Sequence, residues 1–218
     1  MVASGMLSAL PAPAELERRC QALAVLDAIL CPDPRWREYS FDPASRPGER
    51  VATMEAATGD GWLIWFSCHG AVIRGFDHES RVSPWGRKPV EPWPGLFDGL
   101  PARLRDGPRL EVDMVESVTF CLWWDAQDPG WRAGVVIQPT IQYQEPDGSE
   151  WLLAELLWPA AYQDHAEEVY ECVVPLEVVE RVYAHEPLTE GLIRAVDPDA
   201  DAAVALATAR AVGFPIGE

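Results

Sequence analysis

The chain changes its hydrophobic periodicity twice, and the order of these changes limits the folds it can adopt. Residues 13–30 carry apolar side chains at helical spacing and precede Pro32 and Pro34, so they predict a helix that ends before these prolines. Short segments with strand character follow, and the helical period returns from residue 149 onward. Helices on both sides of a block of strands are typical of an α+β protein, so we expect the helices to pack on one side or end of an antiparallel sheet.

Strands are predicted at residues 36–41, 50–58, 62–68, 71–76, 110–114, 117–124 and 131–138, with turn residues between most of them. We therefore expect an antiparallel meander of about six strands. The C-terminal helices are predicted at residues 151–158, 160–172, 176–185, 189–196 and 199–212. A parallel, doubly wound sheet is disfavoured because helices do not alternate with the strands. No glycine-rich phosphate loop joins a strand to a helix, so nucleotide binding of that kind has no support.

The length and composition favour one large core. With 218 residues, 48% of them hydrophobic and ten of them tryptophan, the chain has ample apolar material to bury. We predict a single domain over residues 1–218, in which residues 1–12 are flexible. Residues 77–108 are rich in proline and glycine and predict a long irregular loop. Such loops often carry function.

The negative charge is concentrated in the second half of the chain. Residues 1–109 hold 13 lysines and arginines against 14 acidic residues, whereas residues 110–218 hold 4 against 21. Because phosphate groups are bound by clustered basic residues, this balance argues against nucleic acid and against anionic membrane surfaces as partners. It favours a basic protein partner.

The remaining composition points to an intracellular protein. No apolar run is long enough to span a membrane, and residues 1–13 lack the features of a secretory signal, so we expect a cytoplasmic location. The five cysteines are scattered and never spaced as C-x-x-C, which predicts reduced cysteines in the core, with Cys68 among them. We expect neither a cofactor nor a bound metal.

Four carboxylates follow one face of the predicted helix 160–172. Asp164, Glu167, Glu168 and Glu171 are spaced i, i+3, i+4 and i+7. Like charges at this spacing destabilise a helix by roughly 0.2–0.5 kcal/mol per pair, so the pattern marks either a docking face for a basic partner or a solvated helix surface. His165 with Glu168 forms a single i, i+3 pair, which is too little for a helical metal site that draws ligands from several helices.

A histidine between two carboxylates, Asp77-His78-Glu79, opens the irregular loop. The neighbouring charges favour protonated His78, which would suit it to general acid or base catalysis if a pocket lay beside it. The alternative is structural: Asp77 or Ser80 caps a turn, and His78 bonds to the backbone. Adjacent strand residues point to opposite faces, so Cys68 and His69 are not expected to pair.

Tryptophans divide into two groups. Trp123 and Trp124 are neighbours on a predicted strand and therefore face opposite sides of the sheet, as do Trp62 and Trp65; most of these are expected in the core. Trp85 and Trp93 lie in the irregular loop, where they are candidate surface anchors for a partner.

Several segments carry a resemblance. The stretches GFDHES (75–80), SPW (83–85), WPGL (93–96) and PLTE (187–190) resemble those of a family of uncharacterised small acidic bacterial proteins, from residue 10 onward. This family implies no activity and no catalytic residue. In size, acidity and α+β pattern the chain is also similar to immunity proteins, which neutralise bacterial toxins.

The sequence thus supports two hypotheses. The first is a non-enzymatic, cytoplasmic protein-binding domain, and its specific form is an immunity-type inhibitor of a toxin. This domain would bind a basic partner through Asp164, Glu167, Glu168 and Glu171, with Trp85 and Trp93 as apolar anchors. The second is a small-ligand-binding protein or hydrolase-like enzyme that uses Asp77, His78 and Glu79. It requires a concave pocket in which His78 is exposed.

Overall fold

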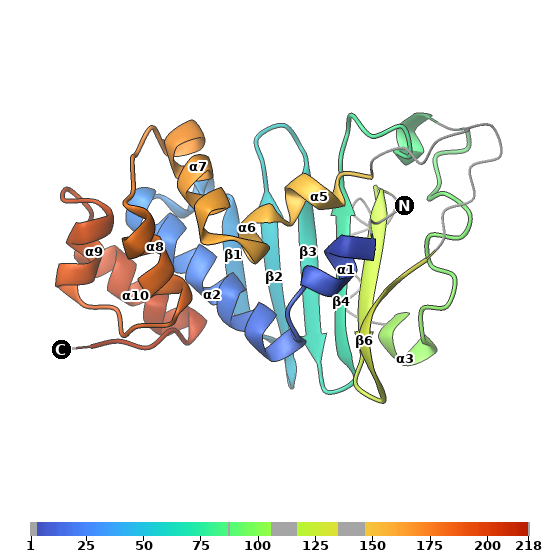
Figure 1. Cartoon of the computed structure of the whole chain (residues 1–218), viewed down its shortest axis with the longest axis horizontal. Coiled ribbons are helices and arrows are strands. Elements are labelled where there is room, and N and C mark those ends of the chain that lie inside the picture. The colour runs from blue at the N-terminus through green and yellow to red at the C-terminus, as the bar shows by residue number, and fades with distance from the viewer. Residues whose placement is uncertain (1–3, 87, 106–116, 135–146, 218) are drawn as a thin grey trace.

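Six antiparallel strands form one sheet in sequence order, β1-β2-β3-β4-β5-β6 (Figure 1). The computed structural model describes residues 4–86, 88–105, 117–134 and 147–217. The strands are β1 (Tyr39–Arg46), β2 (Glu49–Glu55), β3 (Gly61–Ser67), β4 (Gly70–Phe76), β5 (Phe120–Asp125) and β6 (Asp128–Ala133). The predicted α+β class and the antiparallel meander are therefore confirmed. The segment predicted as a strand at 110–114 lies outside the described residues.

Nine α-helices are found around this sheet in the described residues, most of them after β6. They are α1 (Ser4–Ala9), α2 (Pro13–Leu30), α3 (Ala102–Arg105), α5 (Ser149–Leu152), α6 (Ala154–Leu157), α7 (Pro159–Tyr170), α8 (Leu176–Tyr183), α9 (Glu190–Val196) and α10 (Ala202–Val212), with 3-10 turns at Pro34–Trp36 and Pro84–Gly86. None of the helices in these described ranges has the length and apolar character needed to cross a bilayer. The N-terminal helix and the C-terminal group of helices are thus present.

Both faces of the sheet are buried at the central strand β3, which explains the continuous apolar run there. Trp62, Ile64 and Phe66 join the larger core cluster under the helices, while Leu63 and Trp65 join a second cluster on the opposite face. Successive residues of a strand point to opposite faces, so this division follows from the period of two. The predicted opposite orientations of Trp62 and Trp65 are confirmed.

The long helix α2 lies at the β1 end of the sheet, between the strands and the C-terminal helices (Figure 1). It begins with Pro13 in its first turn and ends before Pro32, as predicted. All of its residues from Ala22 to Ile29 are buried, because β1 covers one side of the helix and α8 and α10 cover another. One of these buried residues is the charged Asp27.

The segment after β4 covers the second face of the sheet. Leu96, Leu100 and Leu104, the last of them in α3, are buried against Leu63, Trp65 and Trp123. Part of the predicted irregular loop is therefore a structural cover. The stretch predicted to be flexible near the N-terminus contains α1, and Met6 and Leu10 there join the main core.

Two details differ from the sequence predictions. Cys68 is exposed rather than in the core, because β3 ends at Ser67 and Cys68 belongs to the two-residue hairpin turn that leads to β4. Trp36, predicted to begin a strand, ends a 3-10 turn and is exposed, since Pro34 starts that turn and the Asp33 side chain caps it.

Candidate functional site

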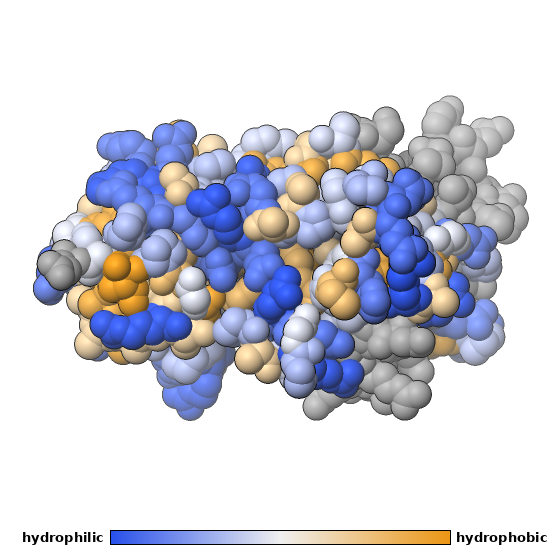
Figure 2. Space-filling view, turned by 90° about the horizontal axis from the view of Figure 1, so that it is seen from below, coloured by the Kyte–Doolittle hydropathy of each residue, from blue (hydrophilic) through white to orange (hydrophobic). Residues whose placement is uncertain are grey.

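A cleft of about 650 Å³ opens at one end of the sheet, where the β2–β3 turn and the end of β4 face α5, α6 and α7. In Figure 1 these elements lie along the upper side of the molecule. Figure 2 shows the molecule from below, at the opposite end of the sheet, where hydrophilic residues lie beside smaller hydrophobic areas. The charged side chains that line the cleft are nearly all acidic: Glu38, Asp60, Asp77, Glu79, Glu155, Asp164 and Glu168. No lysine or arginine from the described part of the chain lines it.

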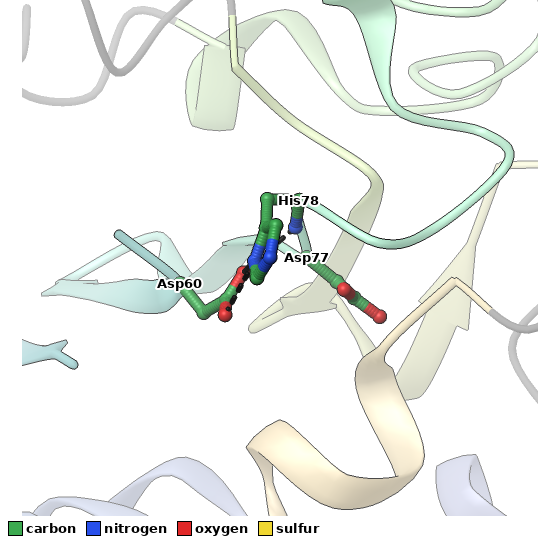
Figure 3. A group of neighbouring side chains, drawn as sticks. All are labelled: Asp60, Asp77 and His78. Carbon is green, nitrogen blue, oxygen red and sulfur yellow. Dashed lines mark hydrogen bonds and ion pairs between the residues drawn. The ribbon is translucent and has the colours of Figure 1, made fainter. Parts of the chain in front are cut away.

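One wall of the cleft holds a hydrogen-bonded pair, Asp60 and His78. Asp60 is buried in the β2–β3 turn and accepts hydrogen bonds from the backbone N–H of His78, at 2.7 Å, and from the Thr58 hydroxyl, also at 2.7 Å. The Nδ1 atom of His78 lies 2.8 Å from both Asp60 carboxylate oxygens (Figure 3). Although burial opposes it, these hydrogen bonds lower the pKa of Asp60.

The same pair sets the charge of His78. The hydrogen bond to Asp60 raises the pKa of His78, and the charges of Asp60, Glu79 and Asp77 add to the effect, while partial burial works against it. The His78 side chain is 48% exposed within the cleft. The ring therefore bonds to a carboxylate and not to the backbone, which corrects the structural alternative offered for this residue. An exposed imidazole beside a buried carboxylate is able to exchange protons with a bound ligand.

Asp77 has a mainly structural role. Its Oδ1 accepts a hydrogen bond from the Glu79 backbone, closing the predicted turn, and its Oδ2 accepts one from the Trp151 indole at 3.2 Å. Figure 3 shows its carboxylate pointing away from His78. Gly148 packs against Asp77 so closely, at φ +87°, that a Cβ atom there would collide with the Asp77 side chain. These contacts tie the end of β4 to α5.

Asp60, Asp77 and His78 also form the one cluster of three or more potential metal ligands found among the described residues. One ligand atom from each lies within 4.8 Å of the others. Both Asp60 oxygens, His78 Nδ1 and both Asp77 oxygens already take part in hydrogen bonds. We interpret the cluster as a hydrogen-bonded wall of the cleft.

The floor of the cleft contains Glu38, Glu155 and His165, none of which was singled out from the sequence as a binding residue. Burial raises the pKa of Glu155 to about 7, with the charge of Glu38 adding to the rise and the Tyr39 hydroxyl opposing it. Burial, followed by the charge of Asp27, raises the pKa of Glu38 as well. Burial lowers the pKa of His165 to about 4, so its imidazole is neutral near pH 7.

Asp27 connects the elements that form this floor through hydrogen bonds. The carboxylate is fully buried and accepts four hydrogen bonds, from the hydroxyls of Tyr162 and Tyr170 and from the backbone N–H groups of Glu38 and Tyr39. It therefore joins α2, the start of β1 and α7. Burial raises its pKa to about 6, although all four hydrogen bonds favour the charged form. A charged residue inside an otherwise apolar helical stretch is the sequence signal that would have identified it.

The acidic residues of α7 divide between two environments. Asp164 and Glu168 line the cleft, whereas Glu167 and Glu171 are exposed outside it. Glu171 is no longer helical, because α7 ends at Tyr170 and Glu171 adopts a left-handed conformation, with φ 53°. No ion pair joins any of these four side chains to a described arginine or lysine. Two of the predicted docking carboxylates thus meet Asp77, His78 and Glu79 in a single site.

The two predicted tryptophan anchors have different environments. Trp85 is 62% exposed, and its indole donates a hydrogen bond to the Ser117 hydroxyl at 3.0 Å. It lines a second hollow, of about 430 Å³, which shares Asp60 and part of its wall with the acidic cleft. Trp93 is half-buried. Trp151, which lines the cleft itself, is 48% exposed and was not predicted as an anchor.

The chain was compared with protein-family models, with curated proteins and with solved structures, and none of the three comparisons finds a match.

Proposed function

We propose that this protein binds a basic partner protein and receives a cationic side chain of that partner in the acidic cleft. One observation supports this proposal above the others: carboxylates from the residue before β1, the β2–β3 turn, the β4 end, α6 and α7 converge on one concave site, and no lysine or arginine of the described residues lines it. Carboxylates held close together repel one another, and a cation placed among them removes this repulsion. The site is therefore better suited to a cation than to an anion or a neutral ligand.

Exposed apolar side chains at the cleft support a macromolecular partner. Trp151 and Val169 line the cleft and are 48% and 41% exposed, and Trp85 lies in the adjoining hollow. Aromatic side chains at the edge of a charged pocket supply the contact area that a single cation does not. A segment of a partner with a basic residue and an apolar neighbour fits both hollows.

The test compares two double variants with the same change in net charge. Asp164→Asn/Glu168→Gln removes two charges inside the cleft, and Glu167→Gln/Glu171→Gln removes two charges from the same part of the chain outside it. The probe is a fluorescent decapeptide containing lysine and arginine, measured by anisotropy at low and high salt. The first variant is expected to weaken binding by about tenfold or more, at about 1.4 kcal/mol for each tenfold change. The second should have a small effect, and high salt should weaken binding to the wild type.

Equal losses in the two double variants would mean that a general acidic field, and not the cleft, attracts the peptide. Absence of peptide binding would refute the proposal itself. An immunity-type inhibitor, as the specific form, additionally requires that the natural partner is a toxin. A gene located directly after that of a large secreted toxin, and inhibition of that toxin by the purified protein, would support this form.

A second candidate function rests on the Asp60–His78 pair. A histidine oriented by a buried carboxylate in an open cleft is the arrangement of a general base that activates water or a hydroxyl group. Asp60 takes the orienting role here, because the Asp77 carboxylate is bonded to Trp151. A panel of chromogenic esters, phosphoesters and glycosides tests this function. Hydrolysis that is lost in His78→Ala and reduced in Asp60→Asn would support it, and hydrolysis unaffected by His78→Ala would exclude this site.

A further inference from the structure

A buried histidine nitrogen without a hydrogen-bond partner lies at the floor of the acidic cleft. His165 is 9% exposed, and its Nε2 atom has no hydrogen-bond partner. The nearest charged atom is Oε2 of Glu38, at 3.9 Å, which is too far for a hydrogen bond. Both side chains line the cleft, and the Glu38 side chain is itself only 12% exposed.

Such an atom is costly to leave unsatisfied. A buried polar group without a partner is destabilising, and native structures satisfy nearly all such groups. The imidazole packs against the rings of Tyr39, Tyr162 and Tyr170, with centroids 5.2–5.8 Å away. The ring is therefore held by its neighbours, and a ligand with an N–H donor that reaches Nε2 through the cleft would satisfy this atom.

The surroundings of Nε2 determine what that ligand carries. A neutral imidazole has one nitrogen that accepts a hydrogen bond. The Glu38 carboxylate near Nε2 and the Glu155 carboxylate, which lines the same cleft, are also acceptors when ionised. Three acceptors at the bottom of one cleft call for a donor with three N–H groups. A primary ammonium ion has three such donors and no acceptor.

The distance between the acceptors favours ammonium over two other cations. The Nε2 atom of His165 and the Oε2 atom of Glu38 are 3.9 Å apart. If one nitrogen donates hydrogen bonds of about 2.8 Å to both atoms, the angle between the two bonds is about 90°, which is close to the tetrahedral angle of an ammonium group. A transition-metal ion with bonds of about 2.0–2.1 Å would need an angle of about 140°. The guanidinium group presents a planar fork that matches the two oxygens of one carboxylate, and not an imidazole nitrogen beside a carboxylate.

We propose that the floor of the cleft binds the primary ammonium group of a lysine side chain from the basic partner, with Glu38, Glu155 and Nε2 of His165 each accepting one of its N–H groups. This inference rests on the proposed function and specifies which basic residue the cleft selects. Met54, Ala154, Ala161 and Val169 line the same cleft and supply an apolar wall for the four methylene groups of the lysine stem.

The experiment uses three acetylated and amidated pentapeptides, GGKGG, GGRGG and GGKGG with a trimethylated lysine, titrated against the full-length protein by NMR. Trimethyllysine keeps the charge and the stem but has no N–H donor. We expect the lysine peptide to bind about tenfold or more tightly than the other two, because only its ammonium group can donate hydrogen bonds to all three acceptors. The imidazole ¹⁵N signal of His165 Nε2 should shift on addition of the lysine peptide alone.

Two variants separate a binding role of the floor from a structural one. His165→Phe keeps the aromatic packing but removes the acceptor, and Glu38→Gln keeps the shape but removes the charge. Both variants are expected to bind the lysine peptide about tenfold less tightly, and His165→Phe should leave the affinity for the trimethyllysine peptide unchanged. A merely structural role of His165 would weaken both peptides alike. The control Glu167→Gln changes an exposed carboxylate on the same helix, and thermal unfolding verifies that each variant is folded.

The outcomes distinguish this inference from the proposed function. If all three peptides bind equally well, or the arginine peptide binds best, the ammonium site is refuted while binding to a basic partner stands. If n-butylammonium binds with the predicted dependence on His165 but the lysine peptide does not, the ammonium site is supported and the protein partner is refuted. If no cationic probe binds, both proposals fail. An Nε2 signal of His165 that stays unchanged at saturation with the lysine peptide would also overturn the ammonium site.

Discussion

Glu155 is a buried acid whose charge costs stability, and its replacement should make the protein more stable at alkaline pH. Burial raises its pKa from the ordinary value of 4.5 to about 7. The folded protein therefore holds this proton more tightly than the unfolded chain does. The favourable contribution of the neutral carboxyl group is complete below pH 4.5, and it is lost as the pH rises through about 7.

The size of the effect follows from the pKa difference. A pKa difference of one corresponds to about 1.4 kcal/mol, so ionised Glu155 costs about 3 kcal/mol of unfolding free energy at pH 8. Glu155→Gln cannot ionise and avoids this cost. The variant should gain about 2–3 kcal/mol relative to wild type between pH 5 and pH 8. With a urea dependence of about 2–3 kcal/mol per molar, its unfolding midpoint should rise by about 1 M over this range.

Urea unfolding at several pH values, followed by circular dichroism, measures this difference directly. Asp27, with a pKa of about 6, titrates in the same window, so only the difference between variant and wild type isolates Glu155. Glu167→Gln is the matched control and should give a difference that does not depend on pH. If the difference for Glu155→Gln is equally large at pH 5 and pH 8, the carboxyl group is not held in a desolvated site, and its role at the cleft floor is refuted. If the reasoning is correct, the same variant binds the lysine peptide less tightly.

Three further predictions concern stability and reactivity. Asp27→Ala leaves four hydrogen-bond donors without their acceptor and should lower the free energy of unfolding by about 3–5 kcal/mol. Calorimetry should show this loss as a fall of about 10 °C or more in Tm, whereas a fall below about 3 °C would contradict the buried network. Gly70→Ala should greatly lower the free energy of unfolding in urea, because φ is +136° and the new Cβ would collide with the Trp124 carbonyl. The control Gly48→Ala has a positive φ but open space around it, and should lower that free energy by about 1 kcal/mol. Similar losses in the two variants would count against the close packing at Gly70. Iodoacetamide should label the exposed Cys68 of the native protein before the buried Cys20 and Cys121, as mass spectrometry of tryptic peptides will show, and prior labelling of Cys20 would contradict the described core.

The sequence was sufficient for the fold because the local signals agree with one another. The helical pattern of residues 13–30 and the two prolines after it predicted the bounds of α2, and the turn residues between short apolar segments predicted the order of the strands. Boundaries were less accurate where a side chain decides them. The helix predicted from residue 199 begins only at Ala202, because the Asp201 side chain caps the backbone N–H groups of Ala203 and Val204.

The candidate site was predicted only in part because it is built from segments that are far apart in the sequence. The acidic helix and the Asp77-His78-Glu79 loop each carried a visible pattern, and the sequence offered them as rival sites. Their convergence on one cleft depends on how α7 packs against β1 and on the β2–β3 turn. Glu38 and Glu155 have no local signature, since their burial comes entirely from tertiary contacts.

Burial of β3 on both faces has a consequence for folding. In a sheet with one solvent-exposed face, a register shift of one residue moves the apolar side chains of a strand into solvent, so the shifted pairing is unstable. In this protein a shifted β3 would still bury Trp62 or Trp65, so hydrophobicity alone discriminates weakly between correct and slipped pairings. The close backbone contacts at Gly61 and Gly70, where carbonyl groups of β2 and β5 leave no room for a side chain, instead exclude every alignment that puts a larger residue there. These two glycines therefore select the native alignment of the central strands.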